Sequence, residues 1–142
     1  MPTATDWIKK LRLRPHPEGG YFRETYRSKE TIPAAALPAR FKRQEKRSVS
    51  TAIYFLITKG KPSYPHRIKS DEMWHFYAGD GLSLTMVSPH GRKRKVKMGK
   101  EAVLQAVVPA GWWMSAEVER GAYALVGCTV APGFDFNDFE LK

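Results

Sequence analysis

The residues best suited to chemistry are a histidine and a glutamate near the middle of the chain, His66 and Glu72. Five residues separate them, and glycines flank the pair at positions 60 and 79. A carboxylate beside an imidazole raises the pKa of the imidazole, which can then remove a proton from a carbon next to a carbonyl group. We therefore predict His66 as a general base with Glu72 as its partner, and Tyr64 as a group that could return the proton.

The chain around this pair is typical of a β-hairpin, which would place the two side chains side by side. Turn-forming residues occupy positions 69–71, and the stretch that follows them is rich in aromatic residues. Alternation along the second strand puts Trp74 and Phe76 on the face of Glu72. His75 then faces the other side, unless a β-bulge returns it to that face.

A second strand pattern, in residues 21–27, adds a carboxylate to the candidate site. Phe22, Glu24 and Tyr26 share one face, and Tyr21, Arg23, Thr25 and Arg27 share the other. Burial of the more apolar face would bring Glu24 inside the fold; the alternative is a carboxylate at the strand edge, paired in water. The rings of Trp74, Phe76 and Trp112 could stack on a sugar or base. The full set of predicted ligand-binding residues is Glu24, Arg23, Trp74, Phe76, His75, Trp112 and Met114.

The elements that must position these residues are mostly strands. About eight strand-like segments separated by turns, with one helical signal at residues 5–11, predict an all-β sandwich or barrel. Apolar residues make up 42% of the chain, which favours a folded domain over disorder. No internal repeat or linker divides the sequence, so we expect one domain over residues 1–142.

The net charge of +10 is concentrated in two short segments, residues 40–47 and 92–100. Such segments can attract phosphate or nucleic acid, but no aromatic residues are interleaved with the charges for base stacking. We therefore expect solvated loops or edge strands, and no nucleic-acid partner.

The location of the protein is predicted from what the sequence lacks. The longest apolar run, residues 52–57, has six residues, whereas a membrane span needs about 20. The N-terminus lacks the apolar core of a signal peptide, and Cys128 as the single cysteine has no disulfide partner in the chain. These observations predict a cytoplasmic protein without a membrane partner.

The spacing around His66 and Glu72 resembles the first motif of the cupin superfamily, G(X)5HXH(X)3-4E(X)6G, with Ile68 at the second histidine. The segment PAGWWM at 109–114 resembles the second motif, with Met114 at its histidine. The segments HPEGGYFRETYRS (16–28), STAIYFLI (50–57), HRIKSDEMWHFYAGD (66–80) and GCTVAPGFDFNDFE (127–140) are similar to a branch of small cupins of unknown function. This resemblance implies a double-stranded β-helix, the RmlC-like jelly roll, and a homodimer.

The resemblance also bears on metal binding and function. The family motifs hold a metal through histidines and a glutamate, but here Ile68 and Met114 replace two histidines, and zinc or iron sites usually need three protein ligands. We therefore predict no metal and no other cofactor. In fold, the branch resembles the sugar-nucleotide epimerases that make dTDP-rhamnose, which act without metal through a histidine base and a tyrosine acid.

The predicted function is binding of a small polar ligand, sugar-like or sugar-nucleotide-like, in the barrel, with metal-independent isomerase or epimerase activity and His66 as base. Two alternatives stay open: a non-catalytic small-molecule binding module, and a metal-dependent oxygenase or isomerase. His66 and Glu72 could also simply hydrogen-bond each other in a barrel that has no chemistry.

Overall fold

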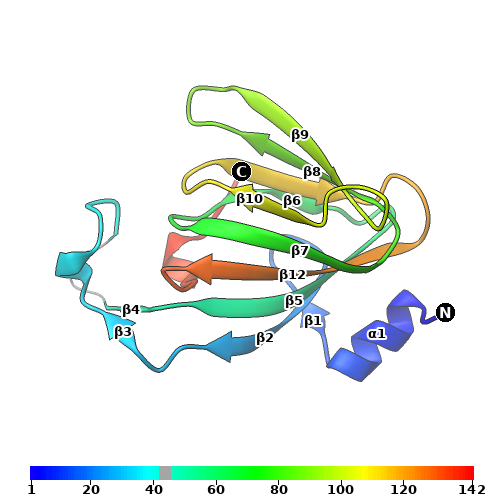
Figure 1. Ribbon diagram of the computed structural model, residues 1–142, viewed down its shortest axis with the longest axis horizontal. Helices are drawn as coiled ribbons and strands as arrows, with labels where there is room; N and C mark the ends of the chain where they lie inside the picture. The colour runs from blue at the N-terminus through cyan, green and yellow to red at the C-terminus, as the bar shows by residue number, and fades with distance from the viewer. Residues whose placement is uncertain (42–45) are drawn as a thin grey trace.

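The computed structural model describes residues 1–41 and 46–142, and it consists of two antiparallel β-sheets that face each other (Figure 1). The larger sheet has the order β1-β2-β5-β12-β7-β10: β1 Arg14–Pro15, β2 Tyr21–Arg27, β5 Thr51–Thr58, β7 Asp71–Gly79, β10 Gln105–Val108 and β12 Tyr123–Ala131. The smaller sheet has the order β13-β6-β11-β8-β9: β6 Ser63–Arg67, β8 Leu82–Val87, β9 Lys93–Met98, β11 Trp113–Glu117 and β13 Glu140–Leu141. This arrangement confirms the predicted all-β jelly roll.

The remaining elements are short. Strands β3 (Thr31–Ile32) and β4 (Arg47–Ser48) pair with each other, and two 3₁₀ turns are η1 (Ala34–Ala36) and η2 (Phe136–Asp138). Helix α1 (Ala4–Leu11) is capped by Thr3, and the Asp6 side chain completes the capping box by accepting from the Thr3 backbone N–H. Within the described residues, no helix is long and apolar enough to cross a membrane.

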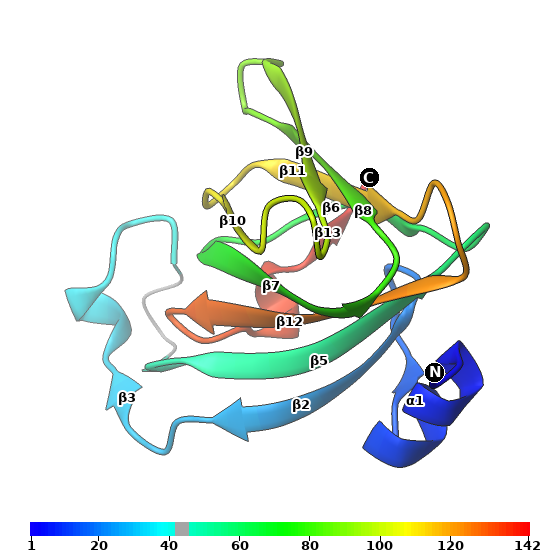
Figure 2. The ribbon, with the colours of Figure 1, turned by 45° about the vertical axis from the view of Figure 1, so that its right-hand side comes forward.

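The space between the sheets has one apolar end and one polar end. Side chains from both sheets, including Phe55, Trp74, Leu84 and Val126, are fully buried and fill the apolar end. At the other end, where β12 finishes, polar side chains point into the space between the sheets, and Glu72 on β7 is one of them. The C-terminal segment after β12 covers this polar end (Figure 2).

Strands β6 and β7 lie in different sheets, so the predicted hairpin is wrong. β6 pairs with β11 and β13, whereas β7 pairs with β10 and β12. The turn between them crosses from one sheet to the other, as jelly rolls require. His66 and Glu72 therefore meet across the interior, and not as neighbours within one sheet.

In the described part of the chain, three β-bulges interrupt the alternation of side chains in the sheets, and two of them, in β2 and β6, lie at the polar end. On β2, Glu24 pairs with Ile53 and Tyr26 with Ala52, so one extra residue lies in β2. On β6, Ser63 pairs with Ala116 and His66 with Met114, so β6 has one residue more between these pairs than its neighbour β11. A bulge reverses the alternation beyond it, so residues three apart share a face.

Candidate functional site

A cavity of about 190 Å³ lies at the polar end of the barrel. Both sheets, the loop after β1 and the C-terminal segment contribute to its walls. Its lining residues are Arg14, His16, Glu18, Phe22, Glu24, Arg27, Thr51, Ile53, His66, Ile68, Glu72, Cys128, Val130, Phe134 and Phe136. Carboxylates, imidazoles and guanidinium groups thus face one small space that is closed on its apolar side by the core.

Glu18 is a buried carboxylate that joins the two sheets. It is 7% exposed, and its two oxygens have different partners. The Ser63 hydroxyl donates to Oε1 over 2.8 Å, and Nε2 of His66 lies 2.9 Å from Oε2. The bulge in β6 makes this possible, because it turns both Ser63 and His66 inward from positions three apart.

The loop that carries Glu18 depends on two glycines. Gly19 and Gly20 have φ angles of +101° and +75°, which L-residues with side chains rarely adopt. A Cβ on Gly19 would collide with the carbonyl oxygen of Pro62. The Tyr64 N–H donates to the Glu18 carbonyl over 2.6 Å, which fixes the loop against β6.

His66 has an acceptor at each ring nitrogen. Nδ1 lies 2.9 Å from the Tyr64 carbonyl oxygen, which can only accept, so Nδ1 carries a proton. Burial lowers the pKa of His66, but the hydrogen bond and charge of Glu18 and the charge of Glu72 outweigh burial, and the pKa lies above its ordinary 6.5. The Phe139 ring stacks on the imidazole with centroids 5.5 Å apart. These contacts favour a doubly protonated imidazolium.

Glu72 faces His66 from β7 and is 8% exposed. Burial and the negative charge of Glu18 raise the pKa of Glu72 to about 7, although His66 and a hydrogen bond from the Cys128 thiol oppose the rise. Burial also raises the pKa of Cys128, which is therefore a neutral thiol. Glu72 can consequently both hold and release a proton near neutral pH.

His16 differs from His66 in its protonation. The backbone N–H of Glu18 donates to Nδ1 of His16 over 3.1 Å, so this nitrogen carries no proton. Burial lowers the pKa of His16, against the opposing charge of Glu18. The ring packs edge-on against Phe22 with centroids 4.5 Å apart. The cavity therefore holds one neutral and one charged imidazole.

Two arginines lie at the cavity on the side of β1 and β2. Arg27 binds Glu24 through Nη2 at 2.6 Å and Nε at 3.2 Å, and it also donates to the Phe134 carbonyl. The bulge in β2 puts Arg27 on the face of Glu24, contrary to the predicted alternation. Arg14 lies over the Phe22 ring and forms no ion pair within residues 1–41 and 46–142.

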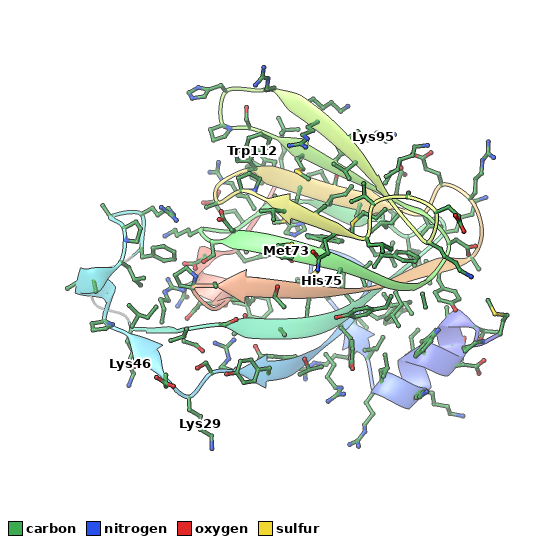
Figure 3. The ribbon with its side chains drawn as sticks, viewed as in Figure 1. Lys29, Lys46, Met73, His75, Lys95 and Trp112 are labelled. Carbon is green, nitrogen blue, oxygen red and sulfur yellow. The ribbon has the colours of Figure 1, made fainter. Side chains whose placement is uncertain are left out.

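Three of the predicted site residues line the cavity: His66, Glu72 and Glu24. Three others point outward. Tyr64 is 55% exposed because it occupies the bulge of β6, and Nε of Arg23 donates to the Leu11 carbonyl near helix α1. His75 lies on the outer face of the large sheet, where Nε2 is 3.0 Å from the Thr129 hydroxyl (Figure 3).

The other four predicted ligand-binding residues lie in the apolar core or pack against it, and they do not line the cavity. They are Trp74, Phe76, Trp112 and Met114. Trp74 is fully buried and packs edge-on against Phe55. The aromatic residues that do line the cavity are Phe22, Phe134 and Phe136.

Sequence reasoning missed Glu18, His16, Ser63, Arg14 and Arg27. The available signal was the pair of glycines directly after Glu18, since such a pair marks a backbone that closely approaches another segment. Pro65 was a second signal, because proline inside a strand favours a bulge or an edge.

The side chains do not fit the metal site that the fold family implies. Among the described residues, no three His, Cys, Asp or Glu side chains are arranged to hold a metal ion. Ile68 lines the cavity where the family has a histidine, and Met114 is buried in the core. Nε2 of His66 is already bound to Glu18.

Two facing antiparallel sheets with a polar cavity at one end define a cupin-type jelly roll. The family described as Cupin superfamily (DUF985) matches residues 5–142, so the chain belongs to this family.

Similar proteins agree with this assignment. An uncharacterized protein of Saccharomyces cerevisiae is 31% identical over 156 residues, covering 97% of this chain and 76% of that protein. A hypothetical protein from Leishmania major has a TM-score of 0.88 and 37% identity, covering 99% of this chain and 87% of the other. A protein from Shewanella oneidensis has a TM-score of 0.86 and 38% identity, and the match covers 100% of this chain and 85% of that protein. Oxalate decarboxylase from Bacillus subtilis shares the fold, with a TM-score of 0.63 and 18% identity over 89% of this chain and 29% of its own.

Proposed function

We propose that this protein binds a small polar, sugar-like molecule in the cavity and acts on it as a metal-independent isomerase or epimerase. The size of the cavity supports a small ligand. Pockets for drug-sized molecules have about 300–1,000 Å³, whereas this cavity has about 190 Å³. A sugar nucleotide would therefore have to leave its nucleotide part outside the mouth.

The observation that carries the proposal is the buried carboxyl group of Glu72, whose pKa is raised to about 7 and which faces the cavity. A general acid or base is most effective when its pKa is near the working pH. Proton removal next to a carbonyl group, followed by return of the proton, interconverts sugar isomers or epimers without a metal.

Exchange of deuterium from the solvent tests this function. The protein is incubated in D₂O with aldoses, ketoses, their phosphates and sugar nucleotides, and loss of the carbon-bound proton is followed by ¹H NMR. We expect exchange with at least one compound, abolished by Glu72→Gln and retained by Glu101→Gln, which changes an exposed carboxylate.

The same experiment separates the alternatives. A ligand that raises the melting temperature but shows no exchange would identify a binding module. Turnover that needs added divalent metal and stops with a chelator would identify a metal-dependent enzyme.

We also propose a homodimer. Val103, Leu104 and Val107 are exposed apolar residues in and before β10, the edge strand of the large sheet. An exposed edge with apolar side chains favours pairing with another chain. Light scattering after size exclusion should give twice the chain mass, and Leu104→Lys should give the monomer mass.

A further inference from the structure

The contacts of His66 leave it without a free nitrogen for a ligand. Nε2 is bound to Glu18 and Nδ1 to the Tyr64 carbonyl, at 2.9 Å each. Glu18 in turn is held by Ser63, and the imidazole is 2% exposed under the Phe139 ring. To accept a proton from a ligand, His66 would first have to lose a proton and break one of these bonds.

Glu72 has the opposite arrangement. Its carboxyl group lines the cavity, and its one hydrogen-bond partner within residues 1–41 and 46–142 is the Cys128 thiol. A thiol is a weak donor, so an oxygen of Glu72 remains available to a bound molecule. Of the buried acids and bases in the cavity, Glu72 is the one whose position suits direct proton transfer.

We infer that Glu72 is the residue that exchanges a proton with the ligand, and that Glu18 and Ser63 are positioning residues that keep His66 as a fixed imidazolium. This inference rests on the proposed function for its ligand. The titratable and charged groups around Glu72 come from every wall: Arg14, His16, Glu18, Glu24, Arg27, His66 and Cys128.

The chemistry points to α-hydroxy carbonyl compounds, that is, aldoses or ketoses. The Glu72 carboxylate takes the proton from the carbon next to the carbonyl group. The electrons of the broken C–H bond form a C=C bond, and the carbonyl electrons move to oxygen, giving an enediolate. Glu72 then returns the proton to the former carbonyl carbon, while the hydroxyl proton passes from its own oxygen to the former carbonyl oxygen. An aldose thereby becomes a ketose, or the reverse, and no oxidant or reductant is needed. The fixed charge of His66 stabilises the negative enediolate, since charges that need no reorganisation act strongly in a buried site.

Nitrogen NMR of the imidazoles tests the charge of His66 without any ligand. Long-range ¹H–¹⁵N spectra of the ¹⁵N-labelled protein are recorded from pH 5 to 9, with His66→Gln for assignment. We expect the midpoint of His66 to lie above 6.5, with both nitrogens protonated below it. Glu18→Gln should lower the midpoint by about one pH unit or more, Ser63→Ala should lower it less, and outward-facing His75 should not change. A midpoint at or below 6.5 in the unaltered protein would overturn the inference.

Carboxyl NMR and exchange rates test the role of Glu72. In ¹³C-labelled protein, one glutamate carboxyl signal should titrate near pH 7 and vanish in Glu72→Gln; titration of every glutamate near 4.5 would overturn the inference. With a sugar that exchanges, Glu72→Gln should lose about 10²-fold or more, whereas Glu18→Gln should keep part of the rate with a shifted pH profile. If no sugar exchanges, the proposed function fails, and the two titrations still decide the protonation states.

Discussion

Breaking the buried ion pair between Arg47 and Asp138 should strongly destabilise the segment that covers the cavity. Nη1 and Nη2 of Arg47 lie 2.8 and 2.6 Å from the two carboxylate oxygens, and the side chains are 1% and 3% exposed. Asp138 belongs to η2, between Phe136 and Phe139. The pair thus attaches the C-terminal segment to β4.

The expected loss on Asp138→Ala follows from this burial. Removing one partner of a buried ion pair costs about 3–5 kcal/mol, because the remaining charge is left without compensation. Asp135, whose carboxylate is 3.8 Å from Arg47, remains, so we expect the lower end, about 3 kcal/mol. For a domain of this size, that is about 9 °C in melting temperature.

The same segment offers a matched control in Arg67–Glu140. This pair is also short, 2.7 Å, but its side chains are 37% and 52% exposed. An exposed pair contributes about 0–1 kcal/mol, so Glu140→Ala should lower the melting temperature by less than about 3 °C. Urea unfolding and calorimetry of both variants give the comparison. Equal losses in the two variants would refute the assignment of the stability to burial.

Three further predictions concern the cavity. The native state keeps the Glu72 proton up to about pH 7, whereas the unfolded chain loses it near the ordinary pKa of 4.5. The free energy of unfolding should therefore fall by about 3 kcal/mol as the pH rises from 4.5 to 7. Glu72→Gln should remove most of this pH dependence in urea unfolding. Gly19→Ala should destabilise the fold by about 1–3 kcal/mol in thermal unfolding, through its positive φ and the collision with Pro62. Arg14→Gln should weaken binding of ribose 5-phosphate about tenfold in calorimetry and leave ribose unchanged, and Arg12→Gln should alter neither.

The fold could be predicted from the sequence because its signals are local. Alternating side chains and turn residues mark each strand, and the spacing around His66 and Glu72 resembles that of a known family. The partner sheet of each strand is not a local property. The same pattern that predicts a hairpin also fits two strands in facing sheets, and only long-range pairing of β6 with β11 decides between them.

The candidate site was predicted less completely, for two physical reasons. Alternation assumes that every second residue points to the same face, and a single extra residue in a strand breaks this rule. The bulge in β6 turns Tyr64 outward, although we predicted it in the site. The bulge in β2 turns Arg27 toward the cavity, although we did not predict it there. Glu18 enters from a loop 48 residues before His66, and no periodic pattern marks a loop residue for burial. The predicted aromatic platform failed because Trp74 contributes to the core instead.

The bulge in β6 has a consequence for how relatives of this protein should be compared and redesigned. With His66 kept opposite Met114 and the single bulge retained, inserting one residue after Pro65 would put Ser63 four positions from His66. Ser63 would then turn to the solvent side, and one of the bonds that hold Glu18 would be lost. A gap of one position in an alignment can therefore exchange the set of groups presented to a ligand while every strand stays in place. Single-residue insertions and deletions, more than substitutions, are the changes to examine when two such barrels differ in specificity.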